Sequence, residues 1–322
     1  MKKILYFSLF SLLLIGCKEQ KPAETNYVSP APVFCEDSAY QYVKEQCAFG
    51  PRVMNSAAHD SCGEYIARQF QRFGMVVHHQ YADSKLYDGT PIKMRNIIAS
   101  YRPEASTRIL LAGHWDSRQW ADNDPDESNH NTPIDGANDG GSSIGVMLEL
   151  ARQLQLANDS DKVKIGVDFI CWDAEDNGIS GGGDESSWCL GSQYWAGHHH
   201  VEGYSARYGI NLDMVGGHQT VFYREQYSMR FAPTVVDKVW AAAQRIGYGN
   251  YFSYDEQGGY ITDDHLQVNR SGIPCIDVIG SDRENGGFPA TWHTMNDNVK
   301  NINKETLKAV GQTMLEVIWT EQ

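Results

Sequence analysis

The chain has 322 residues and a formal net charge of −14 at pH 7, because 41 Asp and Glu residues outnumber 27 Lys and Arg residues. This charge argues against a nucleic acid or an anionic membrane surface as a partner, and it is compatible with substrates that carry an amine. With 41% hydrophobic residues the chain can bury a sizeable core, and its length suits a single α/β domain.

The first residues predict an export signal. A short basic start, Lys2-Lys3, precedes an apolar run over residues 4–15 that is too short to span a bilayer as a helix. The run ends in Leu14-Ile15-Gly16-Cys17, which resembles the lipobox of bacterial lipoproteins. That resemblance implies that residues 1–16 are removed and that Cys17 carries lipid. An ordinary secretory signal with an incidental cysteine is the alternative.

A tether and one domain are expected after the signal. Residues 17–34 are polar and contain three prolines, which is typical of a flexible linker between a membrane and a domain. Residues 35–322 show no repeat and no shift in composition, so we expect one domain, acting as a monomer. The protein would be held by its lipid on a bacterial membrane, the outer membrane, with the domain in the periplasm or at the cell surface.

Six cysteines follow Cys17, and an exported protein can oxidise them. An even number permits complete pairing, but the sequence does not determine the pairs. Because the chain contains no CxxC motif, we do not expect a metal site built from thiolates.

Helical and extended patterns alternate along the domain. Apolar residues at helical spacing predict helices, and short apolar or β-branched runs predict strands. Helices are expected over 36–48, 56–73, 143–155, 233–246 and after Asn303, and strands over 75–80, 95–101, 108–113, 208–212, 273–280 and from residue 167. This order predicts a three-layer α/β/α sandwich with a central mixed β-sheet.

Polar side chains follow several of these strands. His114 and Asp116 come directly after strand 108–113, where a carboxylate can orient an imidazole, although a lone histidine is as often a plain hydrogen-bonding residue. Asp139 lies among small residues at the start of a helix, where capping is the alternative. Asp213 ends a later strand and is followed by glycines.

The strand from residue 167 ends in Asp173-Ala174-Glu175-Asp176, with glycines shortly after. In an open α/β sheet, ligands bind beyond the carboxyl ends of the strands. Adjacent Glu175 and Asp176 suggest that one carboxylate holds a cation while the other moves protons. A solvated acidic turn is the alternative for this segment alone.

Two loop features are less decisive. Trp188 follows a Gly-rich loop and could line a pocket or pack in the core. The acidic segment 121–133 lacks the spacing of a calcium-binding loop, so a solvated loop is expected there.

Together these groups indicate a metal centre. The set consists of His114, Asp139, Glu175, Asp176, Asp213, Asp263 and His293. Carboxylates and imidazoles without thiolates suit zinc with an open coordination position, which is the catalytic arrangement. Each acid taken singly could be a helix cap or a solvated turn residue. No single structural explanation of that kind accounts for so many acids after successive strands.

The sequence resembles the M28 zinc-peptidase superfamily. The matching stretches are His114-x-Asp116-Ser117, Gly136-Ala137-x-Asp139, Asp173-x-Glu175-Asp176, Leu212-Asp213-Met214 and His293-Thr294-x-x-Asp297. Within it the chain is most similar to the glutaminyl-peptide cyclotransferases, through His114-Trp115-Asp116-Ser117-Arg118, Thr262-Asp263-Asp264-His265 and Trp292-His293-Thr294-Met295. The similarity runs from residue 36 to the end.

The resemblance implies roles for the ligand and proton-transfer residues. Asp139, Asp176 and His293 would bind one Zn²⁺, and Glu175 would be the proton shuttle. Many relatives have Glu-Glu where this chain has Glu175-Asp176, so the shorter Asp176 would place the metal nearer the backbone.

The resemblance also implies how the rest of the pocket is built. Asp213 and Asp263 would be supporting acids with a catalytic role, and Trp292 and Trp188 would form the walls of the slot for the substrate side chain. The implied reaction converts an N-terminal glutamine of peptides or proteins to pyroglutamate with release of ammonia.

Two other functions remain open at this point. In a dizinc aminopeptidase, His114 and Asp213 would bind a second zinc and Asp139 would bridge both ions; otherwise His114 and Asp116 would support the first site. A binding protein on an inactive peptidase-like scaffold is the other alternative. Trp292 and the acid pair at Asp263 favour the cyclotransferase, and an intact Glu175 argues against the inactive scaffold.

Overall fold

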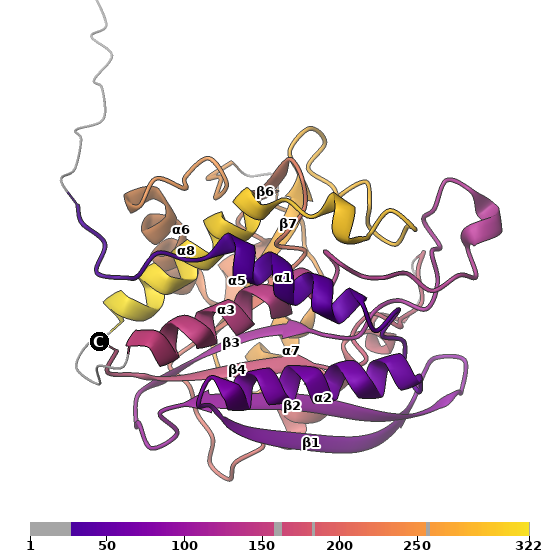
Figure 1. Cartoon of the computed structure of the whole chain (residues 1–322), viewed down its shortest axis with the longest axis horizontal. Helices are drawn as coiled ribbons and strands as arrows, with labels where there is room; N and C mark the ends of the chain where they lie inside the picture. The colour runs from indigo at the N-terminus through magenta and orange to yellow at the C-terminus, as the bar shows by residue number, and fades with distance from the viewer. Residues whose placement is uncertain (1–26, 158–162, 182–183, 256–257, 322) are drawn as a thin grey trace, which may run out of the picture.

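The computed structural model describes residues 27–157, 163–181, 184–255 and 258–321, which form a sheet between two layers of helices (Figure 1). The strands are β1 (Val76–Lys85), β2 (Pro91–Tyr101), β3 (Arg108–His114), β4 (Gly166–Trp172), β5 (Gly209–Asp213), β6 (Thr220–Phe222) and β7 (Cys275–Asp282). They form one seven-stranded sheet in the order β1-β2-β4-β3-β5-β7-β6. The predicted α/β/α architecture with a mixed sheet is confirmed.

Strand direction decides where the site lies. The inner strands β4, β3, β5 and β7 pair in parallel, whereas β1, β2 and β6 pair antiparallel with their neighbours. The carboxyl ends of the parallel strands therefore meet at one edge of the sheet. Polar residues that follow these strands are brought together there, beside the crevice where such sheets bind ligands.

Helices cover both faces of the sheet. On one face lie α1 (Glu36–Cys47), α2 (Ala57–Arg72), α3 (Gly141–Ala157) and α8 (Lys304–Thr320), with α6 (Pro233–Arg245) beside α8 (Figure 1). On the other face α4 (Leu190–Gly197) packs against α7 (Asp264–Arg270), and α5 (Gln226–Phe231) contacts α6 and α7. Short 3-10 turns, η1 (Glu127–Asn129), η2 (Glu185–Ser187) and η3 (Val299–Asn301), lie in loops.

Strand β4 shows why an apolar run without polar alternation is needed here. Val167, Phe169 and Cys171 lie in the core formed with α1, α2, α3 and α8. Ile170 and Trp172 point to the opposite face and lie in the core formed with α4 and α7. Successive side chains of a strand alternate between faces, so a strand covered on both sides must be apolar at nearly every position.

The N-terminal part of the domain begins earlier than expected. The hydroxyl groups of Tyr27 and Ser29 donate hydrogen bonds to the carboxylate of Glu316 in α8. Phe34 is fully buried in the core. A tether was predicted over 17–34, but its described residues, 27–34, pack on α8. They do so because Tyr27 and Ser29 form hydrogen bonds to that helix and Phe34 is buried.

The signal peptide, membrane-spanning helices and the cysteines are the remaining points to compare with the structure. The signal peptide expected over residues 1–16 and Cys17 lie outside the described residues. Across the described ranges, no helix is long and apolar enough to cross a membrane. All six cysteines after Cys17 are free thiols, so the disulfide pairing that the even number permits is not formed.

Candidate active site

A cavity of about 600 Å³ opens at the carboxyl edge of the parallel strands. Its walls include Asp139, Glu175, Asp176, Trp188, Asp213, Asp263, Trp292 and His293. The structure therefore brings together all the residues that the sequence suggests for metal binding at the first site, proton transfer and pocket walls. His114 and Asp116 are buried next to these residues.

Three side chains form a compact candidate metal centre. Asp139, Asp176 and His293 each offer one ligand atom within 4.8 Å of the other two. His293 Nε2 lies 3.0 Å from Asp176 Oδ1 and 3.6 Å from Asp139 Oδ2. In a tetrahedral zinc site with bonds of about 2.0–2.2 Å, ligand atoms are roughly 3.4 Å apart. The buried Asp176 Oδ2 has no hydrogen-bond partner in the described chain, so the donor set and its spacing fit one zinc ion.

The segment that carries Asp139 is held from two sides. The buried carboxylate of Asp297 accepts hydrogen bonds from the backbone N–H groups of Asn138 at 2.7 Å and Asp139 at 3.0 Å. Burial, followed by the charge of Asp139, raises the pKa of Asp297 to about 7. The buried guanidinium of Arg52 donates to the Gly136 carbonyl at 2.7 Å. The position of Asp139 is thus set by residues far away in the chain.

Most residues of the acidic segment 121–133 are exposed or half-buried, as expected of a solvated loop, but two of its acids contact the loop of His293. Asp122 Oδ1 lies 3.5 Å from His293 Nδ1. The carboxylate of Asp124 accepts a hydrogen bond from the Met295 backbone N–H at 2.8 Å. A carboxylate on the far nitrogen of a ligating histidine fixes the ring orientation and leaves the other nitrogen for the metal. The charge of Asp122 therefore lies beside the His293 ring, and Asp124 holds the backbone of the same loop.

His114 and Asp213 form a second cluster that shares Asp139. His114 Nε2 lies 2.9 Å from Asp139 Oδ1 and 3.4 Å from Asp213 Oδ1. Burial alone would lower the pKa of His114, but its three carboxylate neighbours, Asp116, Asp139 and Asp213, raise it well above its usual value. His114 Nε2 is hydrogen-bonded to Asp139, whereas the buried Asp213 Oδ1 has no hydrogen-bond partner in the described chain.

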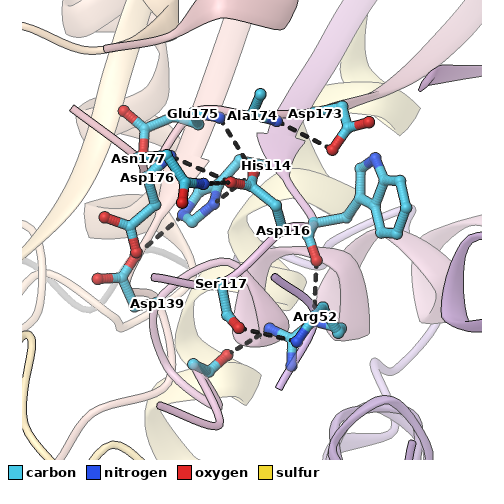
Figure 2. Close-up of polar contacts among 12 residues, drawn as sticks. Arg52, His114, Asp116, Ser117, Asp139, Asp173, Ala174, Glu175, Asp176 and Asn177 are labelled. Atoms are coloured by element: carbon cyan, nitrogen blue, oxygen red, sulfur yellow. Dashed lines mark hydrogen bonds and ion pairs between the residues drawn. The ribbon is translucent and has the colours of Figure 1, made fainter. Parts of the chain in front are cut away.

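Asp116 holds the backbone that carries Glu175 and Asp176. Its carboxylate accepts hydrogen bonds from the N–H groups of Glu175 at 3.1 Å and Asp176 at 3.2 Å, and from the Asn177 side-chain amide at 2.9 Å (Figure 2). It also lies 3.5 Å from His114 Nδ1. The predicted role of orienting His114 therefore describes only one of its contacts.

The first turn of α4 holds the same backbone from the other side. The N–H groups of residues 189–191 donate to the carbonyl groups of residues 173–175 at 2.9–3.1 Å. This close approach requires Gly191, because a Cβ atom there would lie 2.3 Å from the Asp173 carbonyl oxygen. Helix α4 was not predicted from the sequence, and it is the element that docks the Glu175 segment.

Glu175 lies in an acidic environment. Its Oε1 accepts a hydrogen bond from the Cys189 thiol at 3.2 Å, and a carboxylate oxygen of Asp263 lies within 4.8 Å. Burial, then the charges of Asp263 and Asp264, raise the pKa of Glu175 well above its usual value. A carboxylate with a raised pKa can accept and return a proton near neutral pH. Asp263 itself accepts a hydrogen bond from the Asn211 amide at 3.0 Å.

Several site residues have left-handed backbone conformations. Of seven non-glycine residues with positive φ in the described chain, four lie at the site: Ala174 (52°), Cys189 (58°), Met214 (48°) and His293 (56°). This conformation costs an L-residue roughly 1–2 kcal/mol. It persists where surrounding contacts impose it, which agrees with the many hydrogen bonds that hold these segments.

Two indole rings flank His293. The ring centre of Trp292 lies 3.9 Å from that of His293, and the Trp188 ring is nearly parallel to it at 6.1 Å. The Arg118 guanidinium lies 4.9 Å from the Trp188 ring centre and donates to the Asp176 carbonyl at 3.0 Å. Trp188, which the sequence left between pocket and core, thus lies at the cavity.

This arrangement of ligands, acids and rings occurs within a segment that matches a known family. Residues 96–318 match Peptidase family M28. The chain belongs to peptidase family M28. The candidate ligands and Glu175 all fall inside the matched segment of this M28 protein.

Solved structures similar to this M28 protein carry two kinds of name. The glutaminyl cyclase of Bacteroides thetaiotaomicron, bound to N-acetylhistamine, is 54% identical with a TM-score of 0.87, over 91% of this chain and 100% of that chain. The glutaminyl cyclase of Porphyromonas gingivalis is 46% identical with a TM-score of 0.85, over 89% and 98%. A leucine aminopeptidase precursor of Bacteroides thetaiotaomicron VPI-5482 is 53% identical with a TM-score of 0.86, over 92% and 100%.

A curated aminopeptidase also matches this M28 protein. Aminopeptidase YwaD of Bacillus subtilis (strain 168) is 29% identical over 255 residues, which is 76% of this chain and 48% of the relative. The chain thus spans about half the length of that relative. Because both enzyme classes occur among the similar proteins, the residues of the site have to distinguish them.

Proposed function

We propose that this M28 protein is a zinc-dependent glutaminyl-peptide cyclotransferase, which converts the N-terminal glutamine of peptides and proteins to pyroglutamate and releases ammonia. The observation that carries the proposal is the single cavity in which the candidate ligands, Glu175 and the Trp292 ring meet. Similarity to two proteins named glutaminyl cyclase, at 54% and 46% identity, supports it.

We assign Asp139, Asp176 and His293 as the ligands of one zinc ion. When bound there, zinc would supply Lewis acidity at the carbonyl of the glutamine side chain. In this assignment His114 carries a proton on Nε2 beside Asp139, and the second cluster holds no metal. The short Asp176 side chain reaches His293 Nε2 at 3.0 Å, so the loss of a methylene relative to Glu is compatible with a shared metal.

Glu175 moves the proton that the reaction must transfer. The substrate's α-amine nitrogen forms a bond to the side-chain carbonyl carbon, and the bond from that carbon to the amide nitrogen breaks. Glu175 accepts a proton from the attacking amine and donates it to the departing nitrogen, which leaves as ammonia. The carboxylate returns to its starting state, and no water is consumed.

The cavity walls suit a neutral side chain folded back on its own amine. Trp292 and Trp188 offer flat apolar surfaces, while Asp213 and Asp263 line the same cavity as Glu175, where they can accept hydrogen bonds from the amine. Because nucleophile and electrophile belong to one residue, holding the curled conformer contributes much of the rate through proximity. Aromatic walls that exclude water also limit hydrolysis.

The experiment that tests this assignment follows two products from one peptide. The full chain is incubated with a Gln-initiated peptide, and ammonia release and product mass are measured together. Loss of ammonia from an otherwise intact peptide, abolished by a zinc chelator, is the expected result. Release of a free N-terminal amino acid would identify an aminopeptidase instead, and no reaction with zinc bound would indicate a binding protein.

The aminopeptidase remains the second candidate because of one observation. His114, Asp139 and Asp213 offer ligand atoms within 4.8 Å of one another, as a second metal site would require. Metal analysis distinguishes the two assignments. One zinc per chain supports the cyclotransferase, and two support the aminopeptidase.

The rate should increase with pH through the neutral range. The α-amine attacks only when neutral, and its pKa is about 7.7–8.0. Glu175 accepts a proton only when ionised, and burial raises its pKa well above the usual value. Both groups are inactive in their protonated forms, so kcat/KM should rise between about pH 6 and 8.5. A rate constant that is flat over this range, measured with a stable Gln peptide, would contradict the assignment.

We further propose that lipid on Cys17 anchors the protein to the outer membrane. The lipobox-like Leu14-Ile15-Gly16-Cys17 supports the attachment of lipid to Cys17. Two or more acyl chains give durable anchoring, since each buried CH₂ contributes about 0.8 kcal/mol. Cys17→Ser should therefore move the protein from the membrane fraction to the soluble fraction. An unchanged membrane fraction would argue against the lipid anchor.

A further inference from the structure

Cys189 is in contact with Glu175 through both its backbone and its side chain. The Cys189 N–H group donates to the Glu175 carbonyl at 3.1 Å, and its Sγ lies 3.2 Å from Glu175 Oε1 with the geometry of a thiol donor. The residue is only 1% exposed. The reaction as described above does not use this thiol.

Cys189 occupies a helix-capping position, but its side chain does not cap the helix. Cys189 is the N-cap residue of α4, where a side chain commonly accepts a hydrogen bond from the first turn of the helix. Its side chain makes no such bond, and its backbone is left-handed with φ of 58°. A non-glycine residue held in this conformation at a site points to a functional constraint.

The thiol is suited to be a hydrogen-bond donor and unsuited to be a nucleophile. Burial, then the charges of Glu175 and Asp264, raise the pKa of Cys189 well above its usual value. Reactive cysteines have the opposite property, because the thiolate is the nucleophile. Glu175 Oε2 has no hydrogen bond within the described chain, whereas Oε1 is occupied by this thiol.

We propose that Cys189 is a positioning residue for proton transfer. Its thiol donates a hydrogen bond to Glu175 Oε1, which fixes the rotation of the carboxylate and leaves Oε2 to meet the substrate amine. This inference rests on the proposed function for its effect on rate, but the contact itself can be tested independently.

The kinetic test compares three variants of the full chain. Cys189→Ala removes the donor while the residue stays non-glycine, and it should lower kcat for a Gln-initiated peptide about tenfold with KM little changed. Cys189→Ser restores a donor and should recover most of kcat. Cys62→Ala removes another fully buried thiol, and it should lower the melting temperature without lowering kcat.

Infrared spectroscopy tests the contact without any activity. The S–H stretching band of Cys189, isolated as the difference between the wild type and Cys189→Ala, should lie at lower frequency than that of a free thiol. In a Glu175→Gln background the band should move to higher frequency, because a neutral amide is the weaker acceptor. A band at the free-thiol position, or equal kcat for Cys189→Ala and the wild type, would overturn the proposal.

The two measurements separate this inference from the assignment of function. A shifted band in a protein that releases no ammonia would refute the proposed function and leave the thiol contact established. Ammonia release with an unshifted band would refute the contact alone. If the serine variant failed to recover kcat while the alanine variant lost it, the thiol would matter for packing and the positioning role would be wrong.

Discussion

Replacing Glu175 with glutamine is expected to lower kcat for pyroglutamate formation by about 10²- to 10⁴-fold, which is the usual contribution of a positioned acid–base group. Glutamine has nearly the same shape and keeps an oxygen that can accept the hydrogen bond from Cys189. It cannot accept a proton from the amine at neutral pH. The measurement is ammonia release at saturating peptide, together with zinc content and melting temperature.

The variant is informative only if the fold and the metal centre survive. Zinc content should be unchanged because Glu175 is not among the three candidate ligands, and the backbone contacts to Asp116 do not involve its side chain. Glu202→Gln, an exposed acid in a turn, serves as the matched control and should keep full activity. Activity of Glu175→Gln within about tenfold of the wild type would remove Glu175 from proton transfer.

Replacing Gly191 with alanine is expected to damage both stability and activity. The added Cβ atom would lie 2.3 Å from the Asp173 carbonyl oxygen and 2.5 Å from Asn96 Oδ1, so the first turn of α4 would have to move. Overpacking of this kind costs about 1–3 kcal/mol, and each backbone hydrogen bond lost adds about 1 kcal/mol. A shift of about 1 Å at Glu175 can lower kcat about 100-fold.

The same helix offers a matched control. Gly197 ends α4, and a Cβ atom there would meet nothing within 4 Å. Gly197→Ala should keep wild-type kcat and an equal or slightly higher melting temperature, because alanine favours helix over glycine. Thermal unfolding and kcat are measured for both variants. Normal kcat in Gly191→Ala would show that docking of α4 does not position Glu175.

Local sequence pattern was sufficient for six of the seven strands, all except β6, and for the composition of the candidate site. A strand buried on both faces requires a continuous apolar run, and the run from Val167 to Trp172 has one polar interruption at Asp168. Asp168 is neutralised by Arg108, whose Nε lies 2.6 Å from its carboxylate. Acids that directly follow such runs must lie at the carboxyl edge, so their proximity in space follows from the parallel order of the strands.

Contacts that position the site could not be predicted in this way. The segment 121–133 is acidic and looks solvated, yet Asp122 lies 3.5 Å from His293, a residue 171 positions later (293 − 122). Arg52 reaches the Gly136 carbonyl from a loop in the N-terminal part of the domain. No local periodicity encodes a contact between segments so far apart, because helical and strand patterns report only on neighbours within a few residues.

Helix α4 could not be predicted from the sequence either. Its eight residues are too few for a clear periodic stripe, and its N-cap residue, Cys189, is not one that usually starts helices. The helix exists because its first amides bind the carbonyl groups of residues 173–175 and its Trp195 fills the core on that face of the sheet.

The amino-acid sequence by itself therefore determined the layered fold, the set of carboxylates and imidazoles, and the family. The tertiary structure alone decided that Asp116 and the start of α4 hold Glu175, that Asp122 supports His293, and that Cys189 faces Glu175 Oε1. The physical reason is that the type of each residue determines which ligand atom or acid–base group it offers, and residue types can be identified from the sequence alone. The orientation of those residues depends on hydrogen bonds between segments that only folding brings into contact.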